Sequence, residues 1–588
     1  MSARRTWTTL GFAALSAAAV ALAMLVPMQD YTVHILVQTT TFAIAVFGLT
    51  VVLGLCGQIN LAQAAFFGFG AYAVGLGTAD LHMNFWFALA MGAGVALVMG
   101  AFLGMTTLKL GGHYLAMVTI SFQQIVTLIM INWIPVTHGP DGVGNIQRPA
   151  PFQSSQAFLG LCVLAMALVG YLVWRLPGTR LGRSMRAVRD NELAAGVAGV
   201  NVYKVKVAAF ALSALLGGIG GGLFAGGFAY VSPDQFSFAE SIVFMTMTLL
   251  GGVASPVGAV IGTALLIVLP ESLRFLKSVP GLYLAIYGLA IILIIRYMPD
   301  GIWGFVQDRV RRWLPPAPFA APAGELLLAP AQASGKDGDA SAALTVQGLS
   351  KHFGGVKAVD EISFTVARGA VHALIGPNGS GKTTTLNVLS GLYVASAGSV
   401  RLGGRDVTGL PPHARTASGL GRTFQNIRLF RSMTALENVV IGAEHPGNRL
   451  EGGHAALVER ARAALAFVGL EPRAHELVTG FSYGHQRLIE IARALAGNPT
   501  LLLLDEPAAG LNSSEKLGLQ ALLERIAAKG LTILIIDHDM TLVTEVADRI
   551  TVLNFGRCIA DGHASDVLRQ PDVIAAYLGS EPDVPAYA

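Results

Sequence analysis

The chain has 588 residues, longer than one compact domain usually is, and 53% of them are hydrophobic while only 13% are charged. Soluble globular proteins carry about 25% charged residues, so this composition indicates that much of the chain lies in a lipid bilayer, and it excludes an intrinsically disordered chain. The formal net charge of +4 is small for this length and gives no reason to expect a nucleic-acid partner.

Apolar stretches long enough to cross a membrane dominate the first half of the chain. About 20 apolar residues span a bilayer, and a charge at its centre costs roughly 2.5–3.5 kcal/mol on insertion scales. We therefore predict an α-helical, polytopic membrane domain over residues 1–313, with about eight to ten membrane segments. The apolar stretches are residues 9–27, 33–55, 62–78, 85–108, 113–133, 157–174, 207–230, 241–270 and 279–298.

The first stretch follows two arginines, as a secretory signal would. We predict a retained membrane anchor, because the apolar run continues through Val26 and further spans follow. A cleaved signal peptide is the alternative.

Positively charged loops predict the orientation of the spans. Arg4 and Arg5 place the N-terminus in the cytoplasm, and six crossings later the arginine-rich loop 176–205 lies on the same side. The remaining stretches must return the chain to the cytoplasm, so we divide 241–270 at residues 251–256 into either two crossings or a re-entrant pair. This division places Arg274 and Lys277 outside, against the charge rule.

The composition changes after the last apolar stretch. Residues 314–343 are rich in proline and glycine and are predicted to form a polar linker. From residue 344 to residue 588, short β-rich runs alternate with helical segments, as in an α/β domain with a mainly parallel sheet. The β-rich runs include Val371–Ile375, Leu501–Leu504 and Thr532–Ile536.

A phosphate-binding motif stands at the end of the first of these runs. The sequence Gly376-Pro-Asn-Gly-Ser-Gly-Lys-Thr383 matches G-x-x-x-x-G-K-[ST] and lies between a predicted strand and a predicted helix. Backbone N–H groups and the helix N-terminus would hold phosphates, Lys382 would reach the β- and γ-phosphates, and Thr383 would ligate Mg²⁺. The candidate nucleotide-binding residues here are Gly376, Asn378, Gly379, Ser380, Gly381, Lys382, Thr383 and Thr384.

Two carboxylates end a second buried run. Asp505 fits the coordination shell of Mg²⁺, and Glu506 fits the general base that polarises an attacking water. Two solvated acids at a strand end would be the structural alternative, but the phosphate-binding motif in the same chain favours catalysis.

Further motifs resemble those of the ABC ATPases and stand in the same order along the chain. Phe481-Ser-Tyr-Gly-His-Gln486 is similar to the signature sequence, Gln425 to the Q-loop glutamine and His538 to the switch histidine. Phe353 occupies the position of the aromatic residue that stacks on adenine. The resemblance implies ATP and Mg²⁺ as cofactors, catalytic roles for Gln425, Glu506 and His538, and Mg²⁺ ligation by Thr383, Gln425 and Asp505.

In this family the signature residues act on a nucleotide held by another domain. The resemblance implies that Ser482 and Gly484 cover the γ-phosphate bound to a second ATPase domain; an N-cap on its own helix is the structural alternative for Ser482, and the two roles are compatible. Tyr483, His485 and Asn512 depart from the common family pattern, but the residues required for hydrolysis are present.

The membrane half resembles bacterial permeases for branched-chain amino acids. The similarity is carried by residues 57–72, by Gly139-Pro-Asp-Gly142 and by residues 182–195 with their continuation to Phe210. The chain is thus identified as a fusion of a permease subunit and an ATPase subunit.

An arginine repeat in the loop 176–205 is predicted to form a short helix that couples the two halves. The coupling candidates are Arg186, Arg189, Asp190 and Glu192, and the helix is expected to dock near Gln425 of an ATPase domain. A solvated charge stripe that only anchors the loop inside the cell is the alternative.

Two groups of residues within the spans, the glycines and the polar residues, each allow two interpretations. Glycines between residues 217 and 227 predict close helix packing, with a broken, cavity-lining helix as the alternative. Polar side chains at membrane depth line a path or bridge helices. These are Asn60, Gln63, Gln123 and Gln124.

The predicted function is an ABC importer in the bacterial cytoplasmic membrane that takes up branched-chain or related small amino acids. Its expected partners are a second permease subunit, a second ATPase subunit and a periplasmic binding protein. An importer of urea, amides or small aromatic carboxylates is the alternative cargo class, and an exporter half-transporter is disfavoured by the short loops.

Overall fold

The structure is a computed structural model. It describes residues 18–24, 26–107, 113–272, 282–298, 300–311, 325–326, 342–448 and 453–578. The chain forms two compact units. The helical unit comprises Met1–Arg189 and Tyr203–Pro316, and the α/β unit comprises Asp190–Val202 and Ala317–Ala588.

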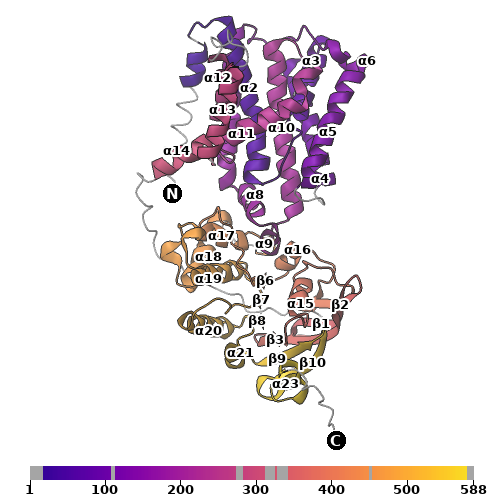
Figure 1. Cartoon of the computed structure of the whole chain (residues 1–588), viewed down its shortest axis with the longest axis vertical. Helices are drawn as coiled ribbons and strands as arrows, with labels where there is room; N and C mark the ends of the chain where they lie inside the picture. The colour runs from indigo at the N-terminus through magenta and orange to yellow at the C-terminus, as the bar shows by residue number, and fades with distance from the viewer. Residues whose placement is uncertain are drawn as a thin grey trace. The chain divides into compact units, whose positions relative to one another are not determined.

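The helical unit is a bundle of apolar helices (Figure 1). Five described helices are long and apolar enough to cross a membrane: Asp30–Leu55, Phe85–Thr106, Tyr114–Asn132, Ser155–Gly178 and Val202–Phe228. The helices are α2 (Asp30–Leu49), continued by the π-helical η1 (Thr50–Leu55), α3 (Gln63–Ala79), α4 (Phe85–Thr107), α5 (His113–Asn132), α6 (Ile134–Thr137), α7 (Ser155–Arg175), α8 (Arg180–Asp190), α10 (Val202–Phe228), α11 (Phe238–Gly251), α12 (Pro256–Ser272), α13 (Leu282–Tyr297) and α14 (Gly301–Arg311).

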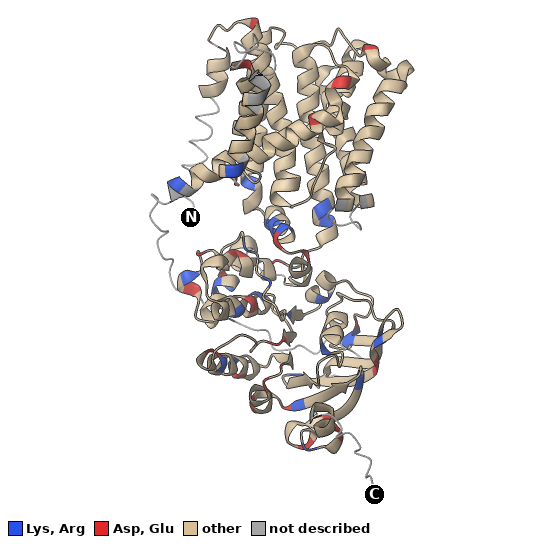
Figure 2. Ribbon diagram, in the orientation of Figure 1, with Lys and Arg blue, Asp and Glu red and all other residues tan. Residues whose placement is uncertain are grey.

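The predicted membrane stretches from 33–55 to 279–298 each contain a helix of this unit. Of the first stretch, residues 18–24 are helical and residues 9–17 lie outside the described residues, as do Arg274 and Lys277. The break predicted within 241–270 is confirmed, because α11 ends at Gly251 and α12 begins at Pro256. In the ribbon of Figure 2, few residues of these helices are coloured as charged, and lysines and arginines gather at the end of this unit where Figure 1 labels α8.

Glycines let the helices of this unit approach closely. A Cβ atom on Gly221 would lie 1.8 Å from the carbonyl oxygen of Phe67, and one on Gly251 would lie 1.9 Å from that of Gly258. Helix α10 is continuous over its 27 residues, so the prediction of close packing is confirmed and the broken-helix alternative is wrong for this segment. The discontinuity lies instead between η1 and α3, where residues 56–62 are not helical.

Polar side chains bridge helices around that discontinuity. Gln63 is buried on α3; its Nε2 donates to the carbonyl oxygens of Ala45 and Ser213, and its Oε1 accepts from the Ser213 hydroxyl at 3.0 Å. Gln123 accepts from the backbone N–H of Ala65 at 2.7 Å, and its Nε2 donates to the carbonyl oxygen of Phe236. The bridging interpretation therefore holds for Gln63 and Gln123.

The other two predicted polar residues differ from each other. Asn60 is buried; it accepts from the backbone N–H of Ala62 and donates to Gln63. Gln124 is exposed on α5. Backbone N–H groups at the start of α3 have no partner within their own helix, and the neighbouring polar side chains satisfy several of them in the apolar interior.

The α/β unit contains two sheets. The six-stranded sheet has the order β10-β9-β3-β8-β7-β6, and the four-stranded antiparallel sheet has the order β2-β1-β4-β5. The strands are β1 (Ala342–Phe353), β2 (Val356–Ala367), β3 (Val371–Ile375), β4 (Ala397–Leu402), β5 (Arg405–Asp406), β6 (Leu420–Arg422), β7 (Leu501–Asp505), β8 (Thr532–Ile536), β9 (Arg549–Asn554) and β10 (Arg557–His563).

Strands β6, β7, β8, β3 and β9 are parallel neighbours, which confirms the predicted mainly parallel sheet. Their apolar runs do not alternate with polar residues because both faces are covered. One face of the sheet, which includes Leu502 and Ile533, packs in one core, and the opposite face, which includes Leu503 and Leu534, packs in another.

Helices surround the larger sheet, and α17, α18 and α19 gather on one side of it (Figure 1). The helices are α9 (Glu192–Val197), α15 (Lys382–Leu389), α16 (Pro412–Ala417), α17 (Ala435–Ala443), α18 (Gly453–Phe467), α19 (Tyr483–Ala496), α20 (Ser513–Ala528), α21 (Met540–Val546), α22 (Ala564–Val567) and α23 (Pro571–Leu578). Within the predicted linker, Leu326 is buried in the core of this unit and Glu325 lies 3.0 Å from Lys529.

Candidate ATPase site

The predicted phosphate-binding loop connects β3 to α15. All five residues of β3 are buried, so the loop begins at a rigid strand end. Gly376 has a φ of 148°, and a Cβ atom there would lie 2.1 Å from the carbonyl oxygen of Leu553. Gly381 has a φ of 97° and caps α15. Both positions require glycine for backbone conformation as well as for space.

Lys382 lies at the centre of this loop. Its Nζ donates to the carbonyl oxygens of Gly376 at 2.8 Å and Pro377 at 2.9 Å. Burial lowers the pKa of Lys382, while the nearby Glu506 and Asp505 carboxylates act in the opposite direction. The loop therefore holds a partly desolvated cation where phosphates would approach the helix N-terminus.

Asp505 ends β7 with its carboxylate buried. Its Oδ2 lies 3.5 Å from Nη2 of Arg422, whereas its Oδ1 has no hydrogen-bond partner among the described residues. Burial raises the pKa of Asp505. An unpartnered carboxylate oxygen beside a phosphate loop fits the ligand set of Mg²⁺, which takes one or two carboxylates together with hydroxyl and phosphate oxygens.

Gln425, Glu506 and His538 converge although they are far apart in sequence. Nε2 of Gln425 donates to Oε2 of Glu506 at 2.8 Å, and Nε2 of His538 lies 2.8 Å from Oε1 of the same carboxylate. The three residues follow β6, β7 and β8, which are adjacent parallel strands, so their carboxyl ends meet at one edge of the sheet. Glu506 has a φ of 46°, a conformation rare for a non-glycine residue and frequent at functional sites.

These residues line a cleft of about 520 Å³ at that edge of the sheet. The predicted residues that line it are Asn378, Gly379, Gly381, Lys382, Thr383, Thr384, Gln425, Glu506 and His538. Sequence reasoning missed the further lining residues Val356, Lys357, Ala358 and Phe555. The first three lie at the start of β2 and Phe555 follows β9, where no motif identifies them.

Other predicted site residues do not line the cleft. Gly376 and Ser380 belong to the loop between β3 and α15, and Asp505 ends β7 directly before Glu506. Phe353 ends β1, is 44% exposed and packs edge-on against Tyr393 with ring centroids 5.3 Å apart. Its ring is thus open to a ligand, and the nearby Nζ of Lys351 lies 5.0 Å from its centroid.

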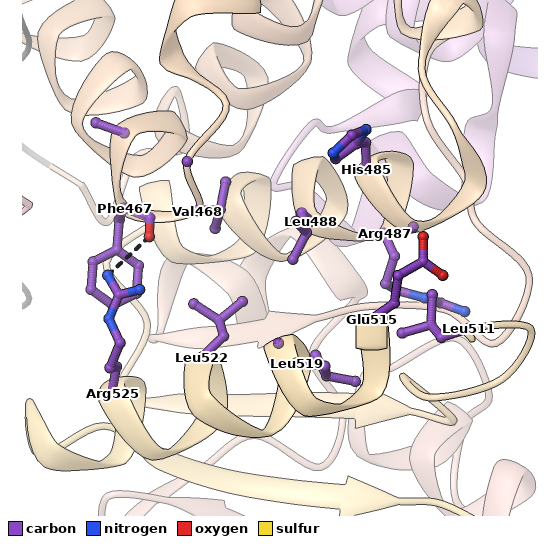
Figure 3. Close-up of a pocket in the computed structure, with 14 residues that line it drawn as sticks. Phe467, Val468, His485, Arg487, Leu488, Leu511, Glu515, Leu519, Leu522 and Arg525 are labelled. Carbon is purple, nitrogen blue, oxygen red and sulfur yellow. Dashed lines mark hydrogen bonds between the residues drawn. The ribbon is translucent and has the colours of Figure 1, made fainter. Parts of the chain in front are cut away.

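The signature residues lie apart from the cleft residues. Ser482 caps α19 by accepting from the backbone N–H of His485, and its Oγ lies 3.0 Å from Nδ1 of that histidine. Gly484 and His485 line a different cavity, of about 350 Å³, between α19 and α20. Figure 3 shows Leu488, Leu519 and Leu522 pointing into this cavity and Glu515 rising beside α19.

A Cβ atom on Gly484 would lie 2.4 Å from Oε1 of Glu515, so a side chain at this position would require the Glu515 carboxylate to move. Within this chain, neither Ser482 nor Gly484 is among the residues that line the cleft at Lys382.

The predicted coupling residues divide between the two units. Arg189, near the end of α8, donates to the carbonyl oxygen of Gly54 in the helical unit at 2.5 Å. In the α/β unit, the Oδ2 of Asp190 accepts from both the backbone N–H and the hydroxyl of Ser432, at 2.7 and 2.8 Å. Arg189 thus bonds within the helical unit, and Asp190, the next residue, bonds within the α/β unit.

The rest of this segment is also held in the α/β unit. Glu192 begins α9, and the carbonyl oxygen of Val197 at its end accepts from the Thr416 hydroxyl at 2.7 Å. Asn201 lies 3.0 Å from Nε2 of His413. Of the arginine repeat, Arg183 is 7% exposed and Arg186 is partly buried, whereas Arg180 and Arg189 are exposed.

Comparison with known proteins finds similarity in both halves of the chain. The family described as branched-chain amino acid transport system / permease component matches residues 31–295, and the ABC transporter family matches residues 359–509. A high-affinity branched-chain amino acid transport ATP-binding protein, BraF of Pseudomonas aeruginosa, is 42% identical over 249 residues, which cover 40% of this chain and 97% of that protein.

Similar relatives occur in other organisms. The LivG protein of Escherichia coli, also a high-affinity branched-chain amino acid transport ATP-binding protein, is 39% identical over 251 residues, which cover 40% of this chain and 97% of LivG. Among solved structures, a nucleotide-free ATP-binding cassette from an ABC transporter is 34% identical, covers 41% of this chain and 100% of that chain, and has a TM-score of 0.37.

The phosphate loop, the carboxylate pair and the convergent glutamine and histidine give the α/β unit the parts of an ATP hydrolase, and apolar helices precede it in the same chain. The chain is a membrane protein that joins a permease component to an ATPase that binds and hydrolyses nucleotide. It belongs to the ABC transporter family, in the group of the branched-chain amino acid transport ATP-binding proteins.

Proposed function

We propose that the protein is the fused permease and ATPase subunit of an importer for branched-chain amino acids in the bacterial inner membrane. One observation carries this proposal. A permease-component match and an ATPase 42% identical to a branched-chain amino acid transport protein occur in a single chain. A periplasmic binding protein would deliver the amino acid, and a second permease subunit would complete the path across the membrane.

In the proposed mechanism, the nucleotide binds in the cleft above the β3–α15 loop. Lys382 exchanges its bonds to the loop carbonyls for bonds to the β- and γ-phosphates. Thr383, Gln425 and Asp505 would hold Mg²⁺, which supplies charge neutralisation for the phosphates. The open, half-exposed ring of Phe353 would stack on adenine.

Hydrolysis then depends on Glu506. Its carboxylate is held from two sides by Gln425 and His538, which orients it toward a water on the cleft side. Ser482 and Gly484 lie outside this cleft, so we propose that a second ATPase domain supplies the equivalent residues to this nucleotide and receives these in return.

The coupling segment would transmit closure of the paired ATPase domains to the helical unit. Arg189 and Asp190 are adjacent in sequence and are bound to different units, so a displacement of Ser432 would pull directly on α8. Because packed interfaces switch between discrete arrangements, a small shift at this point can drive a rigid-body change.

Uptake of radiolabelled leucine into cells that express the assembly tests the proposed function. We expect ATP-dependent, binding-protein-dependent uptake that excess isoleucine or valine suppresses. The Lys382→Ala variant should abolish uptake, whereas Lys529→Ala, which changes a lysine after α20 that lies outside the cleft and pairs with Glu325, should retain it. Suppression by urea, an amide or benzoate but not by isoleucine would assign the alternative cargo class, and efflux of leucine would refute import.

A further inference from the structure

Three charged residues lie three positions apart on helix α19, the helix that the signature sequence begins. Arg487 and Glu490 are 0% exposed and Arg493 is 4% exposed. Nη1 of Arg487 lies 3.0 Å from Oε2 of Glu490, and Nη2 of Arg493 lies 3.4 Å from Oε1. Burying three charges is expensive unless each is paired and hydrogen-bonded, so this triad needs a reason beyond stability.

Other donors and acceptors of the triad contact one backbone segment, residues 424–428, which follows β6, whereas the Nε of Arg487 has no hydrogen-bond partner among the described residues. Arg487 donates to the carbonyl oxygens of Phe424 and Gln425, at 2.5 and 2.7 Å. At the other end of the segment, Arg493 donates to the carbonyl oxygen of Arg428 at 2.7 Å, and Glu490 accepts from its backbone N–H at 3.2 Å. The triad thus binds the segment at both ends.

This segment lies between two functional contacts. The side chain of Gln425 donates to the catalytic carboxylate of Glu506. Four residues beyond Arg428, Ser432 is held by Asp190 of the coupling segment. Because residues 424–428 are held at both ends, a displacement of Ser432 can reach Gln425 instead of being absorbed by local flexibility of the segment.

We propose that Arg487, Glu490 and Arg493 are positioning residues that hold residues 424–428 against α19, keep Gln425 on Glu506 and make hydrolysis depend on the Asp190–Ser432 contact. The dependence of hydrolysis on the Asp190–Ser432 contact rests on the proposed transport function. The positioning of Gln425 concerns ATP hydrolysis alone, so the two parts of the proposal can fail separately.

The test begins with Arg487→Lys in the full chain, purified in lipid nanodiscs with its partner subunits. Lysine keeps the positive charge beside Glu490, but a single ammonium cannot reproduce the forked contact with two carbonyl oxygens. We expect kcat for ATP hydrolysis to fall about tenfold, while KM for ATP and the Kd of a fluorescent ATP analogue stay within about twofold. An unchanged kcat would overturn the proposal.

The matched control is Arg460→Lys. Arg460 also donates to a backbone carbonyl oxygen, that of Ala496 at the end of α19, at 2.8 Å, but it does not contact residues 424–428 in the described contacts. We expect the kcat of this variant to match that of the wild type. An equal loss in both variants would show that any arginine that donates to a backbone carbonyl oxygen in this region matters for folding only.

A double-mutant cycle separates positioning from general damage. If Arg487 acts through Gln425, then Arg487→Lys has little further effect on kcat in a Gln425→Ala background. Independent, multiplicative losses would refute the proposal. If the Arg487 variant does not fold, Arg493→Lys, which alters the other end of the segment, enters the same cycle.

The coupled part of the proposal is tested with Asp190→Asn. We expect this variant to lower the stimulation of hydrolysis by loaded binding protein at least threefold in the wild-type background, and to have no further effect beside Arg487→Lys. Absence of leucine transport with an intact Arg487–Gln425 cycle would refute the transport function and leave the positioning role standing. Additive effects of Asp190→Asn and Arg487→Lys, together with intact leucine transport, would refute the positioning role and leave the transport function standing.

Discussion

Among the residues that the structure describes, buried polar groups in the helical unit are almost all neutral, whereas those of the α/β unit include many charges. In the described helical unit the buried polar residues are amides and hydroxyls, with Arg183 and Lys206 as charged exceptions near helix ends. The α/β unit buries charges throughout its interior, and these include Lys382, Arg415, Arg422, Arg487, Glu490, Arg493 and Asp505.

The difference follows from the solvent and from the task of each unit. In a bilayer an unpaired charge has no water to reach, so internal helix ends are satisfied by neutral groups such as Gln63 and Gln123. The α/β unit must bind a polyanion and activate water, and these tasks need fixed charges that are held in place by other charges. The buried polar groups therefore reflect helix packing in one unit and phosphate chemistry in the other.

The largest expected effect on stability comes from breaking the buried charge triad. Glu490→Gln would leave Arg487 and Arg493 buried without their carboxylate, so we expect the free energy of unfolding of the α/β unit to fall by about 3–5 kcal/mol. Pulse proteolysis of the full chain in nanodiscs across a urea series measures this. Glu545→Gln, the same change at an exposed position of α21, should stay within about 0.5 kcal/mol. Equal stabilities for the two variants would contradict the contrast between the units.

A neutral amide at the catalytic position should remove hydrolysis but not binding. In Glu506→Gln the side chain keeps its size but can no longer accept a proton, so we expect kcat to fall about 10²–10³-fold while ATP binding persists. Phosphate release and binding of a fluorescent ATP analogue measure the two properties. A rate near that of the wild type would show that another group serves as the base.

Substitution of the buried Gln123 in the helical unit should lower stability, whereas the same substitution at its exposed neighbour Gln124 should not. Gln123→Leu would leave the backbone N–H of Ala65 without its acceptor, so we expect a loss of about 1–3 kcal/mol in stability. Gln124→Leu changes an exposed position on the same helix and serves as the control. Thermal unfolding of both variants in nanodiscs measures the difference, and comparable losses would count against a bridging role.

A further expected effect is a pH dependence centred on β3. His372 is buried beside Thr551, and burial lowers the pKa of His372 from 6.5 to about 4. As the pH falls, His372 of the unfolded chain therefore binds a proton at a higher pH than His372 of the folded chain does. The contribution of the neutral histidine is fully present above pH 6.5 and is lost as the pH falls toward 4, at about 1.4 kcal/mol per pH unit. Urea unfolding between pH 7 and 5 should show a steeper decline in the wild type than in His372→Gln.

Most of the cleft could be predicted because its residues belong to local motifs. Lys382 and Thr383 follow a strand within one short segment, and parallel strand order then brings Gln425, Glu506 and His538 to one edge. Val356 and Phe555 could not be predicted as lining residues, because their positions depend on how the second sheet and β9 fold over the loop.

In the helical unit, the sequence predicted where helices lie but not how they are joined. Apolar length located the spans, and the glycine-rich break at residues 251–256 divided α11 from α12. The glycines of α10 left two interpretations open, and only the contact with Phe67 decided for packing. The discontinuity before α3 had no distinctive signal apart from the polar residues around it.

The amino-acid sequence by itself determined the membrane-spanning character, the α/β class and the order of the nucleotide motifs, because apolar run length and motif spacing depend on residues that are neighbours in the chain. Only the tertiary structure decided that Gln63 bonds to Ser213, 150 positions away, that Asp190 holds Ser432, and that a charged triad on α19 binds the backbone at Gln425. These contacts join distant segments, and they exist because packing leaves each buried polar group only a few partners within reach.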